Sequence, residues 1–209
     1  MGRLKESLAK VNKRWHFLFM SNRHKKNPKS ETTRQAILEA AQWQFYEKGY
    51  DGASVRQIAQ AVPIDPAMIM RYFGSKEGLF SAAVMIDLKL PDPDTIPRDK
   101  AGAALVAHFL NLWEGDRSAI GLPILLRSAV SNQDASDKIR AVFEEQVAPT
   151  IAGLTKTDDA DTRAGLIVSQ LFGLALCRYI LKLPPVVDMT TDEIIARIGP
   201  VVQDHLWRD

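Results

Sequence analysis

Apolar residues recur every three or four positions along most of this chain, which is the pattern of amphipathic α-helices. In residues 33–48 the apolar stripe consists of Ile37, Ala40, Ala41 and Phe45, and Gly49 supplies a stop signal. Similar stripes predict helices near residues 54–62, 65–74, 75–84, 99–114, 117–132, 135–153, 159–183 and 191–207. No alternation typical of strands extends over a convincing length, so the pattern predicts an all-α fold.

Capping residues mark where three of the short helices begin. Ser54 is followed three positions later by Gln57, which is a capping-box pattern. Asp65 precedes a proline, whose missing N–H costs nothing at the first helical position, and Ser75 precedes the next helix. The apolar residues expected to pack these helices together are Ile58, Ala59, Ile64, Ile69 and Phe73. Three prolines inside later stripes are expected to kink or end their helices, namely Pro123, Pro149 and Pro200.

The pattern divides the chain into three parts. Residues 1–30 form a basic extension with nine Lys and Arg, one acid and a one-sided apolar stripe. It is either an accessory arm or an extension preceding a later start at Met20, and it lacks the cleavage site of a signal peptide. Residues 31–88 and 89–209 are predicted to be two domains, joined by the proline-rich stretch at 90–97.

Charge is distributed unevenly between the two halves of the chain. The formal net charge is +2, but residues 1–88 carry 14 Lys and Arg against 8 Asp and Glu, and residues 89–209 carry 13 against 17. A basic front half indicates a polyanionic partner, with nucleic acid as the first candidate and an anionic membrane surface as the second.

Composition excludes several classes of protein. The chain of 209 residues is 46% hydrophobic, which argues against disorder. Its longest apolar run, residues 166–177, is shorter than the ~18 to 20 residues of a membrane span. The one cysteine, Cys177, excludes an internal disulfide and fits a reducing cytoplasm, so a cytoplasmic location is expected.

Residues 54–73 carry the pattern from which a function can be inferred. They are predicted to form a helix, a tight turn and a second short helix, the geometry of a helix-turn-helix that places its second helix in the DNA major groove. Spacing alone is weak evidence, because many helical proteins contain such a pair.

The residues themselves resemble the tetracycline-repressor (TetR) family of transcriptional regulators. The resemblance is carried by TRQAILEAA at 33–41, Phe45, EKGYD at 47–51, SVRQIA at 54–59 and RYFGSKEGLF at 71–80. It continues more loosely through SQL at 169–171, GLA at 173–175 and RY at 178–179, which resemble the regulatory domain of actinobacterial members. The resemblance implies a helix-turn-helix domain followed by a helical ligand-binding and dimerisation domain.

DNA contacts are expected at helix N-termini, which bind phosphate, and on the early exposed face of the second helix, which reads bases. Pro66, Ala67 and Met70 suit thymine methyls, and Arg71 is the base-reading candidate able to pair bidentately with guanine. The full set of candidate contacts is Arg34, Ser54, Val55, Arg56, Pro66, Ala67, Met70, Arg71, Tyr72 and Lys76.

Two residues depart from the family pattern. Pro63 stands where a turn glycine is usual, and since proline is not expected to supply a positive φ, the turn is expected to differ in detail. Met70 stands where an aromatic residue is usual, which removes a phenol. The bases that this protein reads therefore cannot be copied from relatives.

In the C-terminal domain the resemblance implies a homodimer through the last two long helices and a pocket for a small molecule. The residues available to line that pocket indicate a largely apolar effector. The candidate dimer residues are Gly165, Ser169, Gly173, Ile194, Ile198, Val201 and Val202, although small residues also pack helices within a monomer. The candidate pocket residues are His108, Phe109, Trp113, Arg127, Phe143, Phe172, Leu176 and Cys177.

Other classes of function find less support. The four histidines lack metal-ligand spacing, and a phosphate-binding glycine loop and an activated-serine motif are not found, so neither an enzyme nor a metal or cofactor site is expected. The sequence favours a ligand-responsive repressor that binds double-stranded DNA as a homodimer on a palindrome. An activator of the same architecture, a non-specific architectural DNA-binding protein and a membrane-binding module remain as alternatives.

Overall fold

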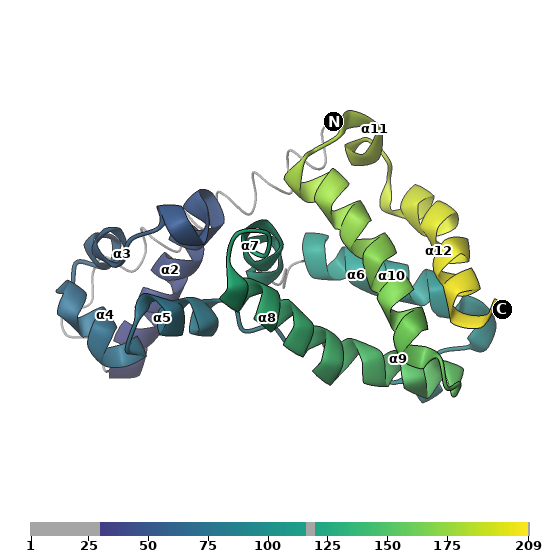
Figure 1. Ribbon diagram of the computed structural model, residues 1–209. Coiled ribbons are helices and arrows are strands. Elements are labelled where there is room, and N and C mark those ends of the chain that lie inside the picture. Colours follow the sequence, from purple (N-terminus) through teal and green to yellow (C-terminus); the bar gives the residue numbers. More distant parts are fainter. Residues whose placement is uncertain (1–29, 116–119, 209) are drawn as a thin grey trace. The chain divides into compact units, whose positions relative to one another are not determined.

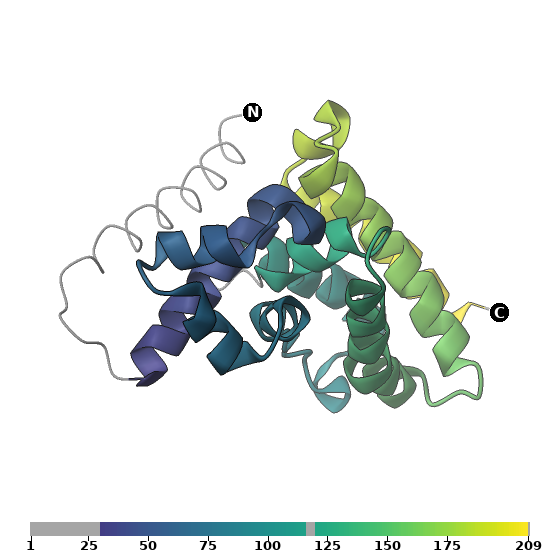
Figure 2. The same ribbon diagram turned by 60° about the vertical axis from the view of Figure 1, so that its left-hand side comes forward.

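The computed structural model describes residues 30–115 and 120–208. Within those ranges every regular element is a helix, which confirms the predicted all-α fold (Figures 1 and 2). The chain forms two compact units, one ending at Ala83 and the other beginning at Val84. The predicted basic extension falls almost entirely in residues 1–29, outside the described ranges.

The N-terminal unit is built from α2 (Ser30–Gly52), α3 (Val55–Ala61), α4 (Pro66–Phe73) and α5 (Lys76–Ala83). The regular path of α2 breaks at Gly49, whose φ of 69° lies in the region that glycine adopts without strain. An edge-to-face pair of Phe45 and Phe80, with ring centres 5.1 Å apart, packs α2 against α5. Ile58 and Ile69 are fully buried and close the core from α3 and α4, as the stripes predicted.

The C-terminal unit contains the remaining elements. They are η2 (Pro93–Thr95), η3 (Arg98–Lys100), α6 (Ala101–Glu114), α7 (Gly121–Ser128), α8 (Gln133–Val142), η4 (Phe143–Val147), α9 (Ala148–Thr155), α10 (Ala160–Ala175), η5 (Leu176–Ile180), α11 (Pro184–Val187) and α12 (Thr191–Trp207). The approach of α6 and α12 requires glycine, because a Cβ on Gly102 would lie 2.3 Å from the carbonyl oxygen of Gly199. Buried side chains of α6, α9, α10 and α12 form one apolar core.

None of the three prolines ends its helix. Pro200 does not end α12, which continues to Trp207; this proline is exposed, so water can bind the carbonyl that it leaves without a partner. Pro123 lies in the first turn of α7, where its missing N–H has little effect. Pro149 follows the wide π-helical turn η4, through which α8 continues into α9. The helix therefore stays continuous at this proline.

The boundary between the units also differs from the predicted one after residue 88. Residues 84–92, here called the connecting segment, form no helix, and they belong to the C-terminal unit. Val84 and Leu88 are buried there, and this burial moves the boundary toward the N-terminus.

One described helix, Ala160–Ile180, is long and apolar enough by composition to cross a membrane, although its longest uninterrupted apolar run is short. Core helices pass the same test, and one side of this helix is buried in the C-terminal unit with an ion-paired Arg163. The helix is therefore weak evidence for a membrane span.

Candidate DNA-binding surface and apolar cavity

Side-chain caps fix the start of each short helix in the N-terminal unit. Ser54 Oγ accepts a hydrogen bond from the backbone N–H of Gln57 at 3.2 Å. Asp65 Oδ1 accepts from the N–H of Ala67 at 2.8 Å, and Ser75 Oγ accepts from that of Gly78 at 3.0 Å. The three predicted helix starts are thereby confirmed.

The turn between α3 and α4 has an unexpected backbone. The N–H of Ile64 donates to the carbonyl of Ala59 at 3.1 Å, which is the outer hydrogen bond of a Schellman motif. That motif needs a left-handed residue before Ile64, and Pro63 occupies the position with a φ of 23°. The expectation that Pro63 would not supply a positive φ was wrong. Because proline prefers a φ near −65° and lacks the N–H for the inner bond, this turn is strained.

The exposed face of α4 is the candidate reading surface. Pro66, Ala67, Met70 and Arg71 are exposed, while Ile69 turns into the core. Met70 is unusual in being a large apolar side chain with 44% of its surface exposed. The face therefore combines apolar contact groups with one guanidinium, which is the chemistry expected for thymine methyls and guanine.

Three further candidates are held in place by neighbouring side chains, two of them by aromatic rings. Lys76 Nζ lies 4.4 Å from the ring centre of Tyr50. The Arg34 guanidinium lies 5.3 Å from the ring centre of Phe73, and the hydroxyls of Tyr72 and Ser30 are 3.0 Å apart. The two ring contacts restrict the positions that the Lys76 ammonium and the Arg34 guanidinium can adopt.

Glu77 supports the same region from the first turn of α5. Its carboxylate accepts a hydrogen bond from the Tyr50 hydroxyl at 2.8 Å. Backbone N–H groups at the helix start, then Ser75 and Tyr50, lower the pKa of Glu77. The lowered pKa favours the charged form of the Glu77 carboxylate, which orients the Tyr50 ring beneath Lys76.

The other three candidates lie at the start of α3. Ser54 and Arg56 are exposed, and Val55 is half-buried. The hydroxyl of Ser54 is engaged as the helix cap, so a phosphate there would meet mainly the free N–H groups of the first turn.

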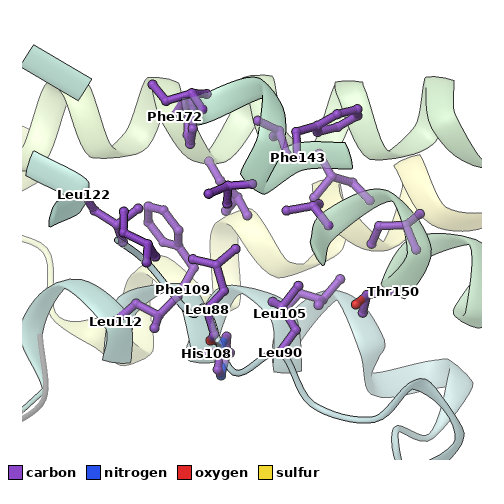
Figure 3. A pocket seen from close by; sticks show the side chains of 18 of the residues that line it. Leu88, Leu90, Leu105, His108, Phe109, Leu112, Leu122, Phe143, Thr150 and Phe172 are labelled. Atoms are coloured by element: carbon purple, nitrogen blue, oxygen red, sulfur yellow. Dashed lines mark hydrogen bonds between the residues drawn. The ribbon is translucent and has the colours of Figure 1, made fainter. Parts of the chain in front are cut away.

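The C-terminal unit contains a cavity of about 110 Å³ (Figure 3). Five of the predicted pocket residues line it, namely His108, Phe109, Trp113, Phe143 and Phe172. In Figure 3, Phe172 and Phe143 lie on one side of this space and Leu112 and His108 on the other. Two polar side chains of the wall bond to the backbone: His108 Nε2 donates to the carbonyl of Leu88 at 2.9 Å, and Thr150 Oγ1 donates to that of Gln146 at 2.8 Å. The buried indole N–H of Trp113, also a wall residue, has no hydrogen-bond partner among the residues that the structure describes.

Three predicted pocket residues do not line the cavity. Leu176 and Cys177 lie beyond Phe172, the last residue of α10 in the wall, and 41% of the Leu176 surface is exposed. Arg127 is exposed on α7 and is not among the residues that line the cavity. The cavity that the structure contains therefore does not include these three residues.

Sequence reasoning missed most of the aliphatic wall, because only aromatic and polar residues were singled out. Two signals could have found it. Leu105 and Leu112 lie on the same helical stripe as Phe109. Ile86, Leu88 and Leu90 alternate with polar residues, which is the pattern of an extended segment with one apolar face.

A buried polar network lies beside the cavity and was also missed. Arg178 Nε donates to Glu114 Oε1 at 2.8 Å, and the Tyr179 hydroxyl donates to the same oxygen at 2.7 Å. The other end of the guanidinium donates to the carbonyl of Val187, at the end of α11, and to that of Met189 beyond it. Burial, and then the Glu114 charge, raises the pKa of Tyr179. Trp113 stacks on the Tyr179 ring at 4.6 Å and so connects the network to the cavity wall.

The predicted dimer residues divide into two groups. Gly165, Ser169 and Gly173 are exposed on α10, and a Cβ on either glycine would meet nothing within 4 Å. Leu166, Leu176 and Val201 add exposed apolar surface. Ile194 and Val202 are fully buried within their own chain and Ile198 packs against the same core, so assigning Ile194 and Val202 to an interface was wrong.

Comparison with protein families matches both units. A family model described as "Bacterial regulatory proteins, tetR family" matches residues 37–83. A second, described as "Tetracyclin repressor-like, C-terminal domain", matches residues 99–206.

Individual relatives agree with this match. The chain is 42% identical over 59 residues to the HTH-type transcriptional repressor AcnR of Corynebacterium glutamicum, covering 28% of this chain and 31% of AcnR. It thus spans about a third of that curated relative. A TetR-family regulator from Streptomyces coelicolor is 27% identical with a TM-score of 0.59, over 88% of this chain and 99% of that one. NalD, the secondary repressor of an efflux pump in Pseudomonas aeruginosa, shares the fold at 22% identity and a TM-score of 0.65, over 87% and 100%.

Proposed function

The chain belongs to the TetR family of bacterial transcriptional regulators, and we propose that it is a homodimeric repressor that leaves a palindromic DNA site when a small apolar molecule occupies its C-terminal cavity. The exposed face of α4 carries the proposal, because a capped short helix there presents a guanidinium beside apolar groups. Repressor rather than activator is favoured because AcnR and NalD are described as repressors. DNA as the target places the protein in the cytoplasm.

Base reading is assigned to Arg71, Ala67 and Met70 on α4. Arg71 is exposed and can pair with O6 and N7 of a guanine, and the two apolar residues fit thymine methyls. In duplexes selected from a random pool, Arg71→Ala should relax the preference at one base pair per half-site by ~1 to 3 kcal/mol. The matched control is Arg140→Ala on the exposed surface of α8. Unchanged preference in the Arg71 variant would remove this residue from base reading.

The partner proposed for the open face of α10 and α12 is a second copy of the chain. Exposed glycines let two helices approach closely, and Leu166 and Leu176 supply apolar surface to bury. Leu166→Arg should convert the dimer to a monomer in light scattering at micromolar concentration. Val130, which is 95% exposed on the turn after α7, provides the control as Val130→Arg. A wild-type monomer would contradict this part of the proposal.

The proposed effector is neutral and apolar. His108 and Thr150 are bonded to backbone carbonyls, and most of the other wall residues are aliphatic or aromatic, so a ligand would meet mainly carbon. A cavity of about 110 Å³ is comparable with dry apolar cavities that accept benzene. Toluene should bind more tightly than benzoate in calorimetry, since the wall, as far as the structure describes it, includes no Lys or Arg to pair with a buried carboxylate. Equal affinities would contradict the apolar assignment.

Release from DNA follows if the ligand favours a conformation that does not fit the operator. The alternative is an architectural protein that binds DNA without a preferred site. A binding reaction that depends on salt but selects no sequence would favour that alternative.

A further inference from the structure

The connecting segment is itself a wall of the cavity. Ile86, Leu88 and Leu90 line it, and all three belong to the chain that directly follows α5. A molecule in the cavity would therefore touch the peptide that joins the two units. Coupling between ligand and DNA then depends on what holds this peptide in place.

One side chain holds the segment at two backbone positions. Gln146 Oε1 accepts a hydrogen bond from the N–H of Leu88 at 2.8 Å, and Gln146 Nε2 donates to the carbonyl of Ile86 at 3.0 Å. His108 Nε2 donates to the carbonyl of Leu88 at 2.9 Å. Both backbone polar groups of Leu88 are thus occupied. We call the pair of Gln146 bonds the glutamine clamp.

Gln146 reaches the connecting segment from a different part of the cavity wall. Gln146 lies in the π-helical turn η4, between the wall residues Phe143 and Val147. Both hydrogen bonds have ordinary lengths and engage both ends of the side-chain amide. They therefore cannot be kept at these lengths if η4 and the connecting segment move apart. Widening the cavity would therefore lengthen or break these bonds.

The segment is also strained where it is clamped. Lys89 has a φ of 46°, which a residue with a side chain seldom adopts, and its N–H donates to Asp87 Oδ1 at 2.9 Å. Such a conformation persists only where its surroundings hold it. Release of the clamp would let the segment relax to another path.

We propose that Gln146 is the positioning residue that couples ligand to DNA: it holds the connecting segment in its DNA-binding path, and a ligand in the cavity acts by breaking the glutamine clamp. This inference rests on the proposed function. Because part of the ligand's binding free energy is then consumed in breaking the clamp, removal of the clamp has two opposite effects. It weakens DNA binding, and it strengthens ligand binding.

The experiment measures both affinities in Gln146→Ala, with toluene as the probe and a duplex selected by the wild-type full chain. The control is Gln203→Ala, which removes an equivalent clamp: Gln203 Oε1 accepts from the N–H of Gly102 and its Nε2 donates to the carbonyl of Arg98, each at 2.8 Å. In Gln146→Ala the Kd for DNA should rise at least about fivefold and the Kd for toluene should fall, with neither changed in the control.

Several results would overturn the inference. A Gln146 variant that binds DNA as the control does, or that binds both DNA and toluene more weakly, would show a merely structural residue. If Gln146→Ala does not fold, Gln146→Met decides, since it keeps a side chain of similar length and loses both bonds, and should shift both affinities in the same directions. A wild type that selects a duplex but takes up no toluene overturns the inference and leaves DNA binding standing. A wild type that selects no duplex refutes the proposed function itself, before any variant is made.

Discussion

The two units of the molecule begin their helices in different ways. In the N-terminal unit, Ser54, Asp65 and Ser75 each cap the helix that follows. In the C-terminal unit, α6, α7, α10 and α11 begin without a side-chain cap, whereas η2, α8 and α12 have one. Local signals therefore determine the DNA-reading unit, whereas contacts between distant residues determine the unit with the cavity.

The largest expected effect breaks a distant contact in the C-terminal unit. Arg178→Ala leaves the Glu114 carboxylate without its cationic partner and removes the side-chain donor to three backbone carbonyls, those of Val186, Val187 and Met189. We expect a loss of ~3 to 5 kcal/mol in the free energy of unfolding by denaturant. Arg140→Ala, which breaks an exposed ion pair with Asp137, should cost less than ~1 kcal/mol. Equal losses would mean that the buried network does not stabilise this unit.

A local change should stabilise the N-terminal unit. Pro63→Gly removes the strain of a left-handed proline and restores an N–H for the Schellman motif. Relief of ~1 to 3 kcal/mol is partly offset by ~1 kcal/mol of glycine entropy, so a net gain of about 1 kcal/mol is expected in thermal unfolding. A lower midpoint in the glycine variant would show that the proline conformation is not strained.

A smaller effect is expected on the salt dependence of DNA binding by the N-terminal unit. Lys76 lies over Tyr50 at the start of α5, in position for one phosphate. Lys76→Ala should lower the slope of log K against log salt by about 0.9 and weaken binding to all sequences alike. Lys138→Ala on α8 is the control, and an unchanged slope in the Lys76 variant would exclude a phosphate contact.

The smallest expected effect is on the pH dependence of stability, and it involves one carboxylate in each unit. Helix-start N–H groups lower the pKa of Glu77, and the N–H of Thr190 lowers that of Glu193. A lowered pKa in the folded state contributes stability above the ordinary glutamate pKa, and this is lost as pH falls through the folded value. Glu77→Gln and Glu193→Gln should each flatten the acid side of the stability profile slightly. An unchanged profile in both would show that these caps do not depend on charge.

Helices were predicted most accurately where their caps are local. The stripes and caps place α3, α4 and α5 within one residue of their observed bounds. In the C-terminal unit the short helix α11 and the π turns were not predicted, because they depend on Arg178 and on a register change within a long helix.

The candidate sites show the same contrast. Exposed residues on α4 could be chosen from helix position alone, since exposure there follows from one stripe. Leu176 was placed in the pocket and Ile194 in the interface because residue type and spacing do not say which neighbour a helix face meets. The role proposed for Gln146 could not be predicted from the sequence, because its hydrogen bonds join residues about 60 positions apart.

Selection of bound duplexes from a random DNA pool by the full chain, read by sequencing, tests the central claim most directly. The account predicts an enriched palindrome whose half-sites carry a guanine and thymines, with centres separated by one helical turn or a multiple of it. Salt-sensitive binding without any enriched sequence would contradict it, and would mean that the strained turn at Pro63 and the apolar face at Met70 do not read DNA.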